Sequence, residues 1–510
     1  MRLHSFGSGD PLAEFEELPQ AQYLRCYLSD LKAKSVVEEP HYFDRDYLDE
    51  FAAYYSRVAT QTSNLCRRLH FFDTAVTDES LSLALEGPGQ ERERLQAAYL
   101  GFTVVRPLSH APLGRSVVKW YPDDLPRYQG NPRITTSRAY SVHLAGLRLE
   151  VVGLAWQQQD GAIALCATTG LWSMLHASAF DDHHAIPSTA EVTRLAYQSL
   201  RQGAHVFPAS DGLDVRQMVE AIARARLTPL LMEGDLANSG FTRDKFAACS
   251  VMLRSGFPVL ISGRLTSGEG HVICATGFRE VGPGGAPGAV VLQDSNIATI
   301  YAHDDNLGPN VRLMVRESKS DGRITLRPKP PPKRYQGRRL KDPVKNYPDF
   351  FPQHLIVGVH EGLHVTADEL NRIAMIITAN LRPHLSNVQE PLTSTARFVR
   401  IAAYLEAVIT TPFGGPLARA KRLAKIRSRI SSELPPMSLH VGVVRVGYGS
   451  APVADVLIDT SDRPHIDTAN SRVARWTAFG TVLFAAGFEA TFNELSRVIP
   501  LGKVLNVGVN

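Results

Sequence analysis

The order of the patterns between residues 150 and 315 constrains the fold more than any other feature of the chain. Apolar residues recur at helical spacing after Cys166 and again in residues 188–200, 212–225 and 242–255. Three apolar, β-branched runs follow these helical segments, separated by polar or glycine-rich loops. Helices that precede hairpin-linked strands predict an α+β domain with an antiparallel sheet, not a doubly wound parallel sheet.

The chain is too long for one hydrophobic core, since it has 510 residues. We expect an α/β region over residues 1–149 and the helix-then-sheet domain over residues 150–315. Residues 316–349 are basic and rich in proline, which favours extended chain and predicts a linker or a hairpin excursion. Residues 350–510 are expected to form a further α/β region.

Composition argues against several classes of function. The net charge is only +4, so we expect no nucleic-acid partner. The longest apolar run, residues 476–488, is shorter than the ~20 residues that a membrane helix needs, and we expect it to form a buried helix. The first residues lack the apolar core of a signal peptide. These features predict a cytoplasmic protein without a membrane span.

The cysteines are few and odd in number. There are 5, and no pair has the CxxC spacing of a zinc site or a redox motif. We therefore expect neither a disulfide framework nor a bound metal or cofactor, and a reducing compartment fits best.

Cys166 is the candidate nucleophile because it stands where a helical pattern begins, just after the turn-forming residues Asp160 and Gly161. The free N–H groups and the positive end of a helix dipole favour a thiolate at such a position. The alternative for any free cysteine is a small buried apolar side chain. We expect that role for three others, which lie within apolar patterns: Cys66, Cys249 and Cys274.

His271 is the candidate partner that would activate Cys166 as a nucleophile. It follows a glycine-flanked loop and opens a strand, so its imidazole can face a cleft at the edge of a sheet. His176 is a rival, but it lies about 15 Å along the axis of the helix that Cys166 begins, too far for a hydrogen bond. His183 and His184 are further rivals in a polar loop.

Asp294 is the candidate that would orient His271, since a catalytic histidine needs an acceptor on its other nitrogen. Asp294 ends the strand that follows the histidine strand across a predicted hairpin. Neighbouring antiparallel strands lie about 4.8 Å apart, so a carboxylate there can reach the imidazole. Asn296 is the alternative orienting residue, and a turn-forming role for Asp294 is the alternative function.

An oxyanion hole needs a side-chain donor beside the backbone N–H of the nucleophile. A glutamine just upstream of Cys166 can supply it, and Gln159 is the nearest. Gln157 and Gln158 compete for the same role.

Four segments in this order resemble papain-like cysteine peptidases, most closely the C39-like families of the bacteriocin-leader peptidase type. The resemblance spans residues 153–305 and rests on the segments QQQDGAIALCATTGLW, GLDVRQMVEAIARARLTPL, LRSGFPVLISG and GHVICATGF followed by VVLQDSN. It implies a papain-like core, with helices followed by an antiparallel sheet, and a triad of Cys166, His271 and Asp294 with Gln159 as oxyanion donor. The flanking regions resemble bacterial proteins that share such a core.

The resemblance implies a thiol-dependent hydrolase, a cysteine peptidase or isopeptidase. We expect the flanking regions to select a protein or peptide substrate or a regulatory protein partner. One alternative keeps the triad for deamidation or acyl transfer. The other is a catalytically idle papain-like module that binds a partner through the basic residues 316–345 and 416–430.

Overall fold

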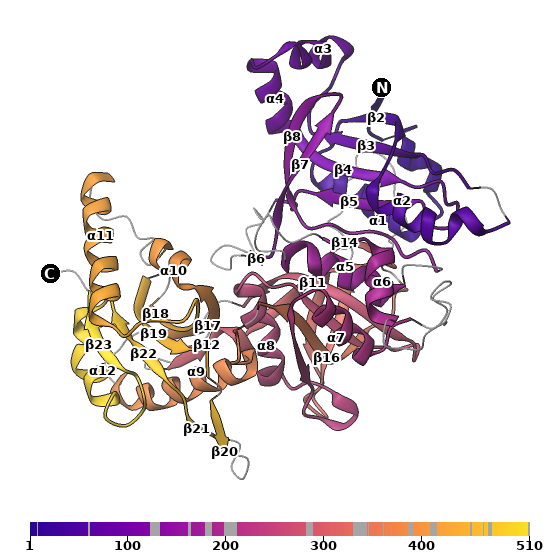
Figure 1. The fold of residues 1–510 in the computed structure, drawn as a ribbon. Coiled ribbons are helices and arrows are strands. Elements are labelled where there is room, and N and C mark those ends of the chain that lie inside the picture. Colours follow the sequence, from indigo (N-terminus) through magenta and orange to yellow (C-terminus); the bar gives the residue numbers. More distant parts are fainter. Residues whose placement is uncertain are drawn as a thin grey trace. The chain divides into compact units, whose positions relative to one another are not determined.

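The computed structural model of the chain (Figure 1) contains two compact units, each built from separate stretches of sequence. Unit 1 comprises Met1–Phe241, Gly256–Phe278 and Thr299–Val359, and unit 2 comprises Thr242–Ser255, Arg279–Ala298 and His360–Asn510. The predicted boundaries at residues 149 and 315 therefore fall inside unit 1. The structure describes every residue except 8, 60–61, 123–132, 162–164, 179–185, 198–211, 282–288, 330–343, 345, 361, 386–390, 408–415, 449–450, 463, 468–471 and 508–510.

Unit 1 begins with a five-stranded antiparallel sheet in the order β1-β2-β3-β4-β5. Its strands are β1 (Arg2–Ser5), β2 (Ser35–Tyr42), β3 (Cys66–Phe72), β4 (Tyr99–Val105) and β5 (Leu113–Val118). A hairpin of β7 (Arg138–Leu144) and β8 (Leu147–Gly153) follows. The residues between its strands, Ala145 and Gly146, have φ of 48° and 93°, the left-handed backbone of a tight hairpin turn.

A closed antiparallel barrel forms the second half of unit 1. Its six strands run in the order β10-β11-β13-β14-β15-β16, and β16 pairs back onto β10. They are β10 (Val259–Leu265), β11 (Gly270–Glu280), β13 (Ile297–Asp304), β14 (Gly308–Glu317), β15 (Ile324–Lys329) and β16 (Phe350–Val359). Two short strands add to it: β6 (Arg133–Thr135) pairs with β11, and β9 (Thr228–Glu233) pairs with β16.

The predicted papain-like core is therefore wrong as a fold class. The chain mixes helices with several sheets and a closed six-stranded barrel, in place of a block of helices followed by one open sheet. Closure removes the free edges of the sheet, but it leaves the alternation of residues along each strand unchanged. The sequence pattern of a barrel strand is thus the same as that of a strand in an open sheet.

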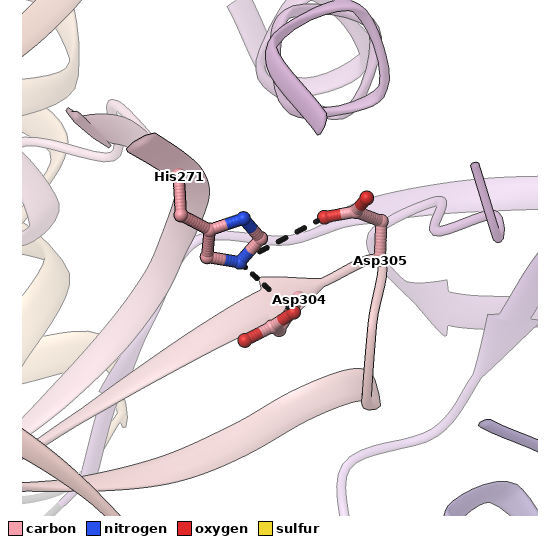
Figure 2. A group of neighbouring side chains, drawn as sticks. All are labelled: His271, Asp304 and Asp305. Atoms are coloured by element: carbon pink, nitrogen blue, oxygen red, sulfur yellow. Dashed lines mark hydrogen bonds and ion pairs between the residues drawn. The ribbon is translucent and has the colours of Figure 1, made fainter. Parts of the chain in front are cut away.

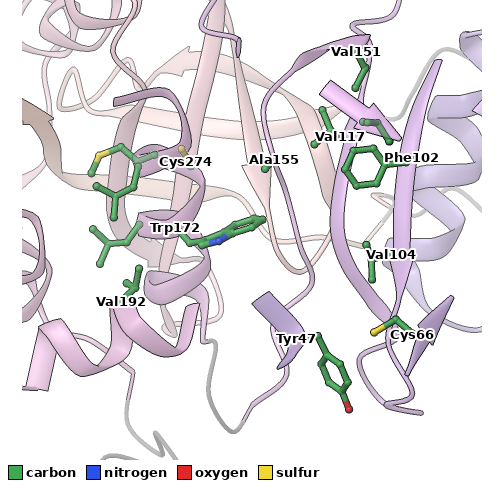
Figure 3. Packing of buried hydrophobic residues seen from close by; sticks show 14 of the residues in the cluster. Tyr47, Cys66, Phe102, Val104, Val117, Val151, Ala155, Trp172, Val192 and Cys274 are labelled. Carbon is green, nitrogen blue, oxygen red and sulfur yellow. The ribbon is translucent and has the colours of Figure 1, made fainter. Parts of the chain in front are cut away.

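The helices of unit 1 other than α1 share one hydrophobic core with both sheets. The helices of this unit are α1 (Pro19–Asp30), α2 (Arg45–Ala53), α3 (Asp78–Glu86), α4 (Gln90–Ala98), α5 (Cys166–Ser178), α6 (Thr189–Tyr197) and α7 (Val215–Arg224). Trp172 of α5 lies in this core with Phe102 of β4 and Cys274 of β11 (Figure 3). Helix α5 begins at Cys166, which is where the sequence pattern predicted the helix start.

Unit 2 contains a six-stranded sheet in the order β12-β17-β18-β19-β22-β23, with parallel pairs at both ends. Its strands are β12 (Val290–Leu292), β17 (Leu392–Arg400), β18 (His440–Tyr448), β19 (Ala451–Asp459), β22 (Ala478–Leu483) and β23 (Lys503–Asn506), with a separate pair of β20 (His465–Asp467) and β21 (Arg472–Arg475). Its helices are α8 (Arg243–Arg254), α9 (Ala367–Leu381), α10 (Ile401–Ala407), α11 (Pro416–Glu433) and α12 (Glu489–Leu495). The helix predicted for residues 476–488 is wrong, because β22 occupies the centre of that run.

In the part of the chain that the structure describes, no helix combines the length and the apolar character needed to cross a membrane. Of the predicted proline-rich linker, residues 330–343 and 345 lie outside the described residues, whereas its first part contains the end of β14 and all of β15.

Candidate active site

His271 is the second residue of β11, and its side chain is only 4% exposed. Its Nε2 lies 3.2 Å from Oδ1 of Asp304, within hydrogen-bond distance. Asp304 is the last residue of β13, the barrel strand next to β11. Figure 2 shows the imidazole pointing at this carboxylate. The acidic partner of the histidine is therefore Asp304.

Asp304 is held by other groups besides His271. The Tyr347 hydroxyl donates to the carboxylate over 3.0 and 3.2 Å, and the backbone N–H of Asn306 donates to Oδ1 over 2.9 Å. The indole N–H of Trp156 donates to the backbone carbonyl of Asp304 over 3.0 Å. These contacts fix both the side chain and the backbone of Asp304, as an orienting carboxylate requires.

The Cys166 side chain lies close enough to the imidazole of His271 to raise the pKa of that histidine through a hydrogen-bond interaction. Because Asp304 occupies Nε2, Nδ1 is the ring nitrogen left for the thiol. The thiol is partly exposed, whereas Cys66, Cys249 and Cys274 are buried as predicted. The structure thus joins Cys166 and His271, although 105 positions separate them in the sequence.

Gly170, one turn into α5, lets the helix lie close against the barrel. A Cβ added there would come within 3.2 Å of Leu260 in β10 and 3.5 Å of Val272 in β11. Val272 directly follows His271 in the same strand. The small residue therefore allows the start of α5 to sit over the histidine.

Burial alone would lower the pKa of His271, but other groups reverse this effect. The charge of Asp304, the hydrogen bonds to Asp304 and Cys166, and the charge of Asp305 together raise the pKa of His271 well above its usual value. The imidazole is thus held in its protonated form, as the partner of a thiolate must be.

This raised pKa predicts how His271 affects stability at different pH. A group whose pKa rises on folding stabilises fully below its unfolded pKa, about 6.5 for histidine, and loses that contribution as pH rises through the folded value. We expect the stability advantage of the wild type over His271→Gln to be largest in mild acid and to shrink in alkali. Urea unfolding of both proteins across this range measures it. An advantage that grows with pH would contradict the assignment.

A small pocket lies beside Cys166, with room for about one water-sized group. It is lined by Trp156, Gln157, Cys166, Thr169, Gly170, Ser173, Val272, His303 and Asp305. Burial raises the pKa of Asp305 to about 7, with the His271 charge lowering it and the Asp304 charge raising it. The pocket therefore combines the nucleophile with several polar side chains.

The three candidate glutamines have different surroundings. Gln157 is 2% exposed and lines the pocket, with its amide nitrogen 3.3 Å from the buried Glu50 carboxylate. The Gln158 side chain hydrogen-bonds backbone groups, since it accepts from the N–H of Leu113 and donates to the carbonyl of His110. Gln159 donates to Asn306 over 2.9 Å and is not among the residues that line the pocket. The geometry thus favours Gln157 over the predicted Gln159.

Asp294 does not orient His271, contrary to the sequence-based expectation. Asp294 lies in a 3-10 turn just after β12, and β12 pairs with β17 in unit 2 instead of forming a hairpin with β11. The Asp294 carboxylate is fully buried, 3.1 Å from Nε of Arg254, and accepts the backbone N–H of Ala396 over 2.6 Å. Asp294 is therefore a structural ion-pair partner inside unit 2. Asn296, the alternative, also belongs to unit 2 and donates to the Val281 carbonyl.

Of the rival histidines, His176 is not brought to Cys166. His176 is buried beside Trp172 and hydrogen-bonds the hydroxyl of Tyr140, and burial lowers its pKa well below the usual value. His183 and His184 lie outside the described residues.

Among the described residues, His271, Asp304 and Asp305 are the set whose ligand atoms lie close enough to hold a metal ion, within 4.8 Å of one another. His271 fits such a role poorly, because its Nε2 faces Asp304 and its pKa is raised. A protonated imidazole has no free lone pair for a metal.

Sequence reasoning missed Asp304, Asp305 and Tyr347, and it placed Gln159 ahead of Gln157. The signal for the two acids was the triplet His-Asp-Asp directly after the strand pattern of residues 297–302. Tyr347 had no signal, since it reaches the site from the segment before β16.

Comparison with known proteins does not show to which family the chain belongs. No protein-family model matches the chain, and no curated protein matches it either. A function for this chain must therefore come from the geometry of the site.

Proposed function

We propose that the protein is a cysteine-dependent hydrolase of amide or isopeptide bonds, with Cys166 as nucleophile, His271 as proton carrier and Asp304 as the orienting carboxylate. One observation carries the proposal: the Cys166 side chain lies close enough to act on an imidazole whose Nε2 faces a buried, fixed carboxylate. That arrangement is the general constellation of an activated nucleophile.

The proposed reaction has two stages. The Cys166 thiolate attacks the substrate carbonyl, and the C–N bond breaks as His271 donates its proton to the leaving amine. Water then attacks the thioester, His271 takes its proton, and the acid product leaves with the thiol restored. Asp304 keeps the imidazole in the required orientation in both stages.

The oxyanion of each tetrahedral intermediate needs two N–H donors. We assign one to the backbone N–H of Cys166 and the other to the Gln157 side chain. Glu50 faces the Gln157 amide nitrogen at 3.3 Å, and an amide carries a second N–H that is left for the pocket. The buried ion pair of Glu50 with Arg106, 3.1 Å apart, fixes this arrangement.

Replacing Gln157 by alanine is expected to lower turnover by about 100-fold, the usual loss for one oxyanion donor. The alkylation rate of Cys166 should change little, because alkylation forms no oxyanion. Gln159→Ala is the matched control and should retain near wild-type turnover. If Gln159→Ala shows the larger loss, the sequence-based assignment of Gln159 is restored.

We propose a protein or peptide substrate, since an amide carbonyl is the natural target of this chemistry. We also propose that the regions outside the site bind a regulatory protein partner. The resemblance to C39-like peptidases stays a prediction from the four segments, and the proposal does not depend on the papain-like fold.

The test is a screen of a peptide library derived from bacterial proteins, with products identified by mass spectrometry. The proposal expects products that disappear in Cys166→Ala and persist in Cys249→Ala. Product masses distinguish cleavage from deamidation. Products made equally well by Cys166→Ala would overturn the proposal.

A further inference from the structure

Asp305 has a buried oxygen that nothing described in the structure satisfies. The residue directly follows β13 and is 4% exposed. Its Oδ2 has no hydrogen-bond partner among the described residues. A carboxylate oxygen out of water without a partner is costly, so such an atom calls for an explanation.

His271 does not supply that explanation. Its Nε2 lies 4.0 Å from Oδ1 of Asp305, compared with 3.2 Å from Asp304. Figure 2 shows the two carboxylates approaching the ring from different directions. Asp304 already orients the imidazole, so the second carboxylate is free for another task.

The charges around the pocket are not balanced. In the proposed active form the Cys166 thiolate and the His271 imidazolium cancel, which leaves the carboxyl groups of Asp304 and Asp305. With a pKa of about 7, Asp305 is partly ionised at neutral pH, and a cation beside it would favour its charged form. The described residues that line the pocket include no lysine or arginine. His303 is neutral, since burial lowers its pKa to about 3.

From this geometry we infer that the pocket selects substrates that carry a primary ammonium group near the scissile carbonyl, and that Asp305 pairs with it. The inference rests on the proposed function and names its substrate class. An ammonium is a compact charge with three donors and is close to a water molecule in size, which suits this small pocket better than a planar guanidinium. Thr169 and Ser173 line the same pocket and carry hydroxyl oxygens that can accept from it.

A metal ion would also satisfy the charge, but the geometry favours the ammonium. A metal would need Nε2 of His271 without its proton, and that nitrogen faces the Asp304 carboxylate. An ammonium leaves the pair of His271 and Asp304 intact.

The test uses three methanethiosulfonate reagents of similar size that modify thiols. Their side groups are aminoethyl, hydroxyethyl and sulfonatoethyl, so they are cationic, neutral and anionic. In each case the Cys166 thiolate displaces methanesulfinate and forms a mixed disulfide. The rate constants are measured on the full chain by intact mass and peptide mapping, and are divided by those of N-acetylcysteine.

The inference predicts that the cationic reagent is favoured over the neutral one by on the order of tenfold, as expected for a cleft lined by one sign of charge. Asp305→Asn should bring this ratio close to one, while Asp305→Glu should keep part of it. Asp321→Asn is the matched control, because Asp321 is half exposed on the surface of unit 1. It should leave the ratio unchanged.

The outcomes separate the inference from the function on which it rests. If Cys166 reacts faster than Cys249 but without a charge preference in the wild type, the inference fails and the proposed hydrolase stands. If Cys166 reacts with none of the reagents, the proposed function itself fails. Stoichiometric binding of Zn²⁺ in equilibrium dialysis, lost in Asp305→Asn, would overturn the ammonium in favour of a metal.

Discussion

Asp304→Ala is expected to slow the alkylation of Cys166 by iodoacetamide at about pH 6 by roughly 100-fold. Burial of His271 lowers its pKa, and the charge and hydrogen bond of Asp304 are the leading effects that raise it. Without Asp304, burial lowers the pKa of the imidazole, and the thiolate loses its charged partner. Each unit of pKa changes the thiolate fraction about tenfold, and only the thiolate reacts.

The measurement is the rate constant for carbamidomethylation of Cys166, followed by peptide mass. Asp304→Asn provides a second variant of nearly the same size, so a folding defect of the alanine variant would not hide the effect. Circular dichroism of both variants checks the fold. An Asp304→Asn protein that alkylates at the wild-type rate would remove Asp304 from the site.

Asp294→Ala is expected to destabilise unit 2 by about 3–5 kcal/mol, the usual result when one partner of a buried ion pair is removed. The substitution leaves the Arg254 guanidinium without one carboxylate and the Ala396 N–H without its acceptor. Hydrogen exchange of the peptides from β17 measures the loss, since Ala396 lies in that strand.

The same variant should leave Cys166 alkylation unchanged, because Asp294 and its partners belong to unit 2. Glu494→Ala is the control in unit 2: its side chain is 66% exposed, so we expect a change within about 0.5 kcal/mol. Slow alkylation in Asp294→Ala with normal exchange in β17 would restore the sequence-based triad.

The contrast between Asp294 and Asp304 shows where sequence reasoning stopped. Two strand-like runs after His271 end in an aspartate, and local pattern does not say which run pairs with the histidine strand. The first run forms β12 with only 3 residues and joins unit 2, whereas the second forms β13 beside β11. An acid does stand at the end of the strand that neighbours the histidine strand, as expected. That neighbouring strand is the later run, β13, and not the earlier run, β12.

Local signals were reliable where the chemistry is local. The spacing of Ser188 and Glu191 predicts a capping box, and the structure contains both of its hydrogen bonds at the start of α6. The start of α5 at Cys166 was also predicted. By contrast, residues 476–488 are apolar and contain both helix and strand formers, and a short apolar run does not distinguish the two.

Features that depend on pairing between segments far apart in the sequence could not be predicted. Barrel closure joins β10 to β16, and most residues of the site lie between these two strands in the sequence. The choice among the glutamines depends on the bridge of Trp156 to Ser116, which sets the direction of the chain before Cys166. Side chains alternate along an extended chain, so Gln157 and Gln158 point to different surroundings.

The most direct test of the central claim compares two cysteines of the same protein. Burial raises the pKa of the Cys249 thiol, so Cys249 should be nearly inert to iodoacetamide at about pH 6. A thiolate paired with His271 predicts that Cys166 reacts at least about 100 times faster than Cys249, and that His271→Ala removes most of this difference. Equal, slow reaction of Cys166 and Cys249 in the wild type would contradict the proposed nucleophile.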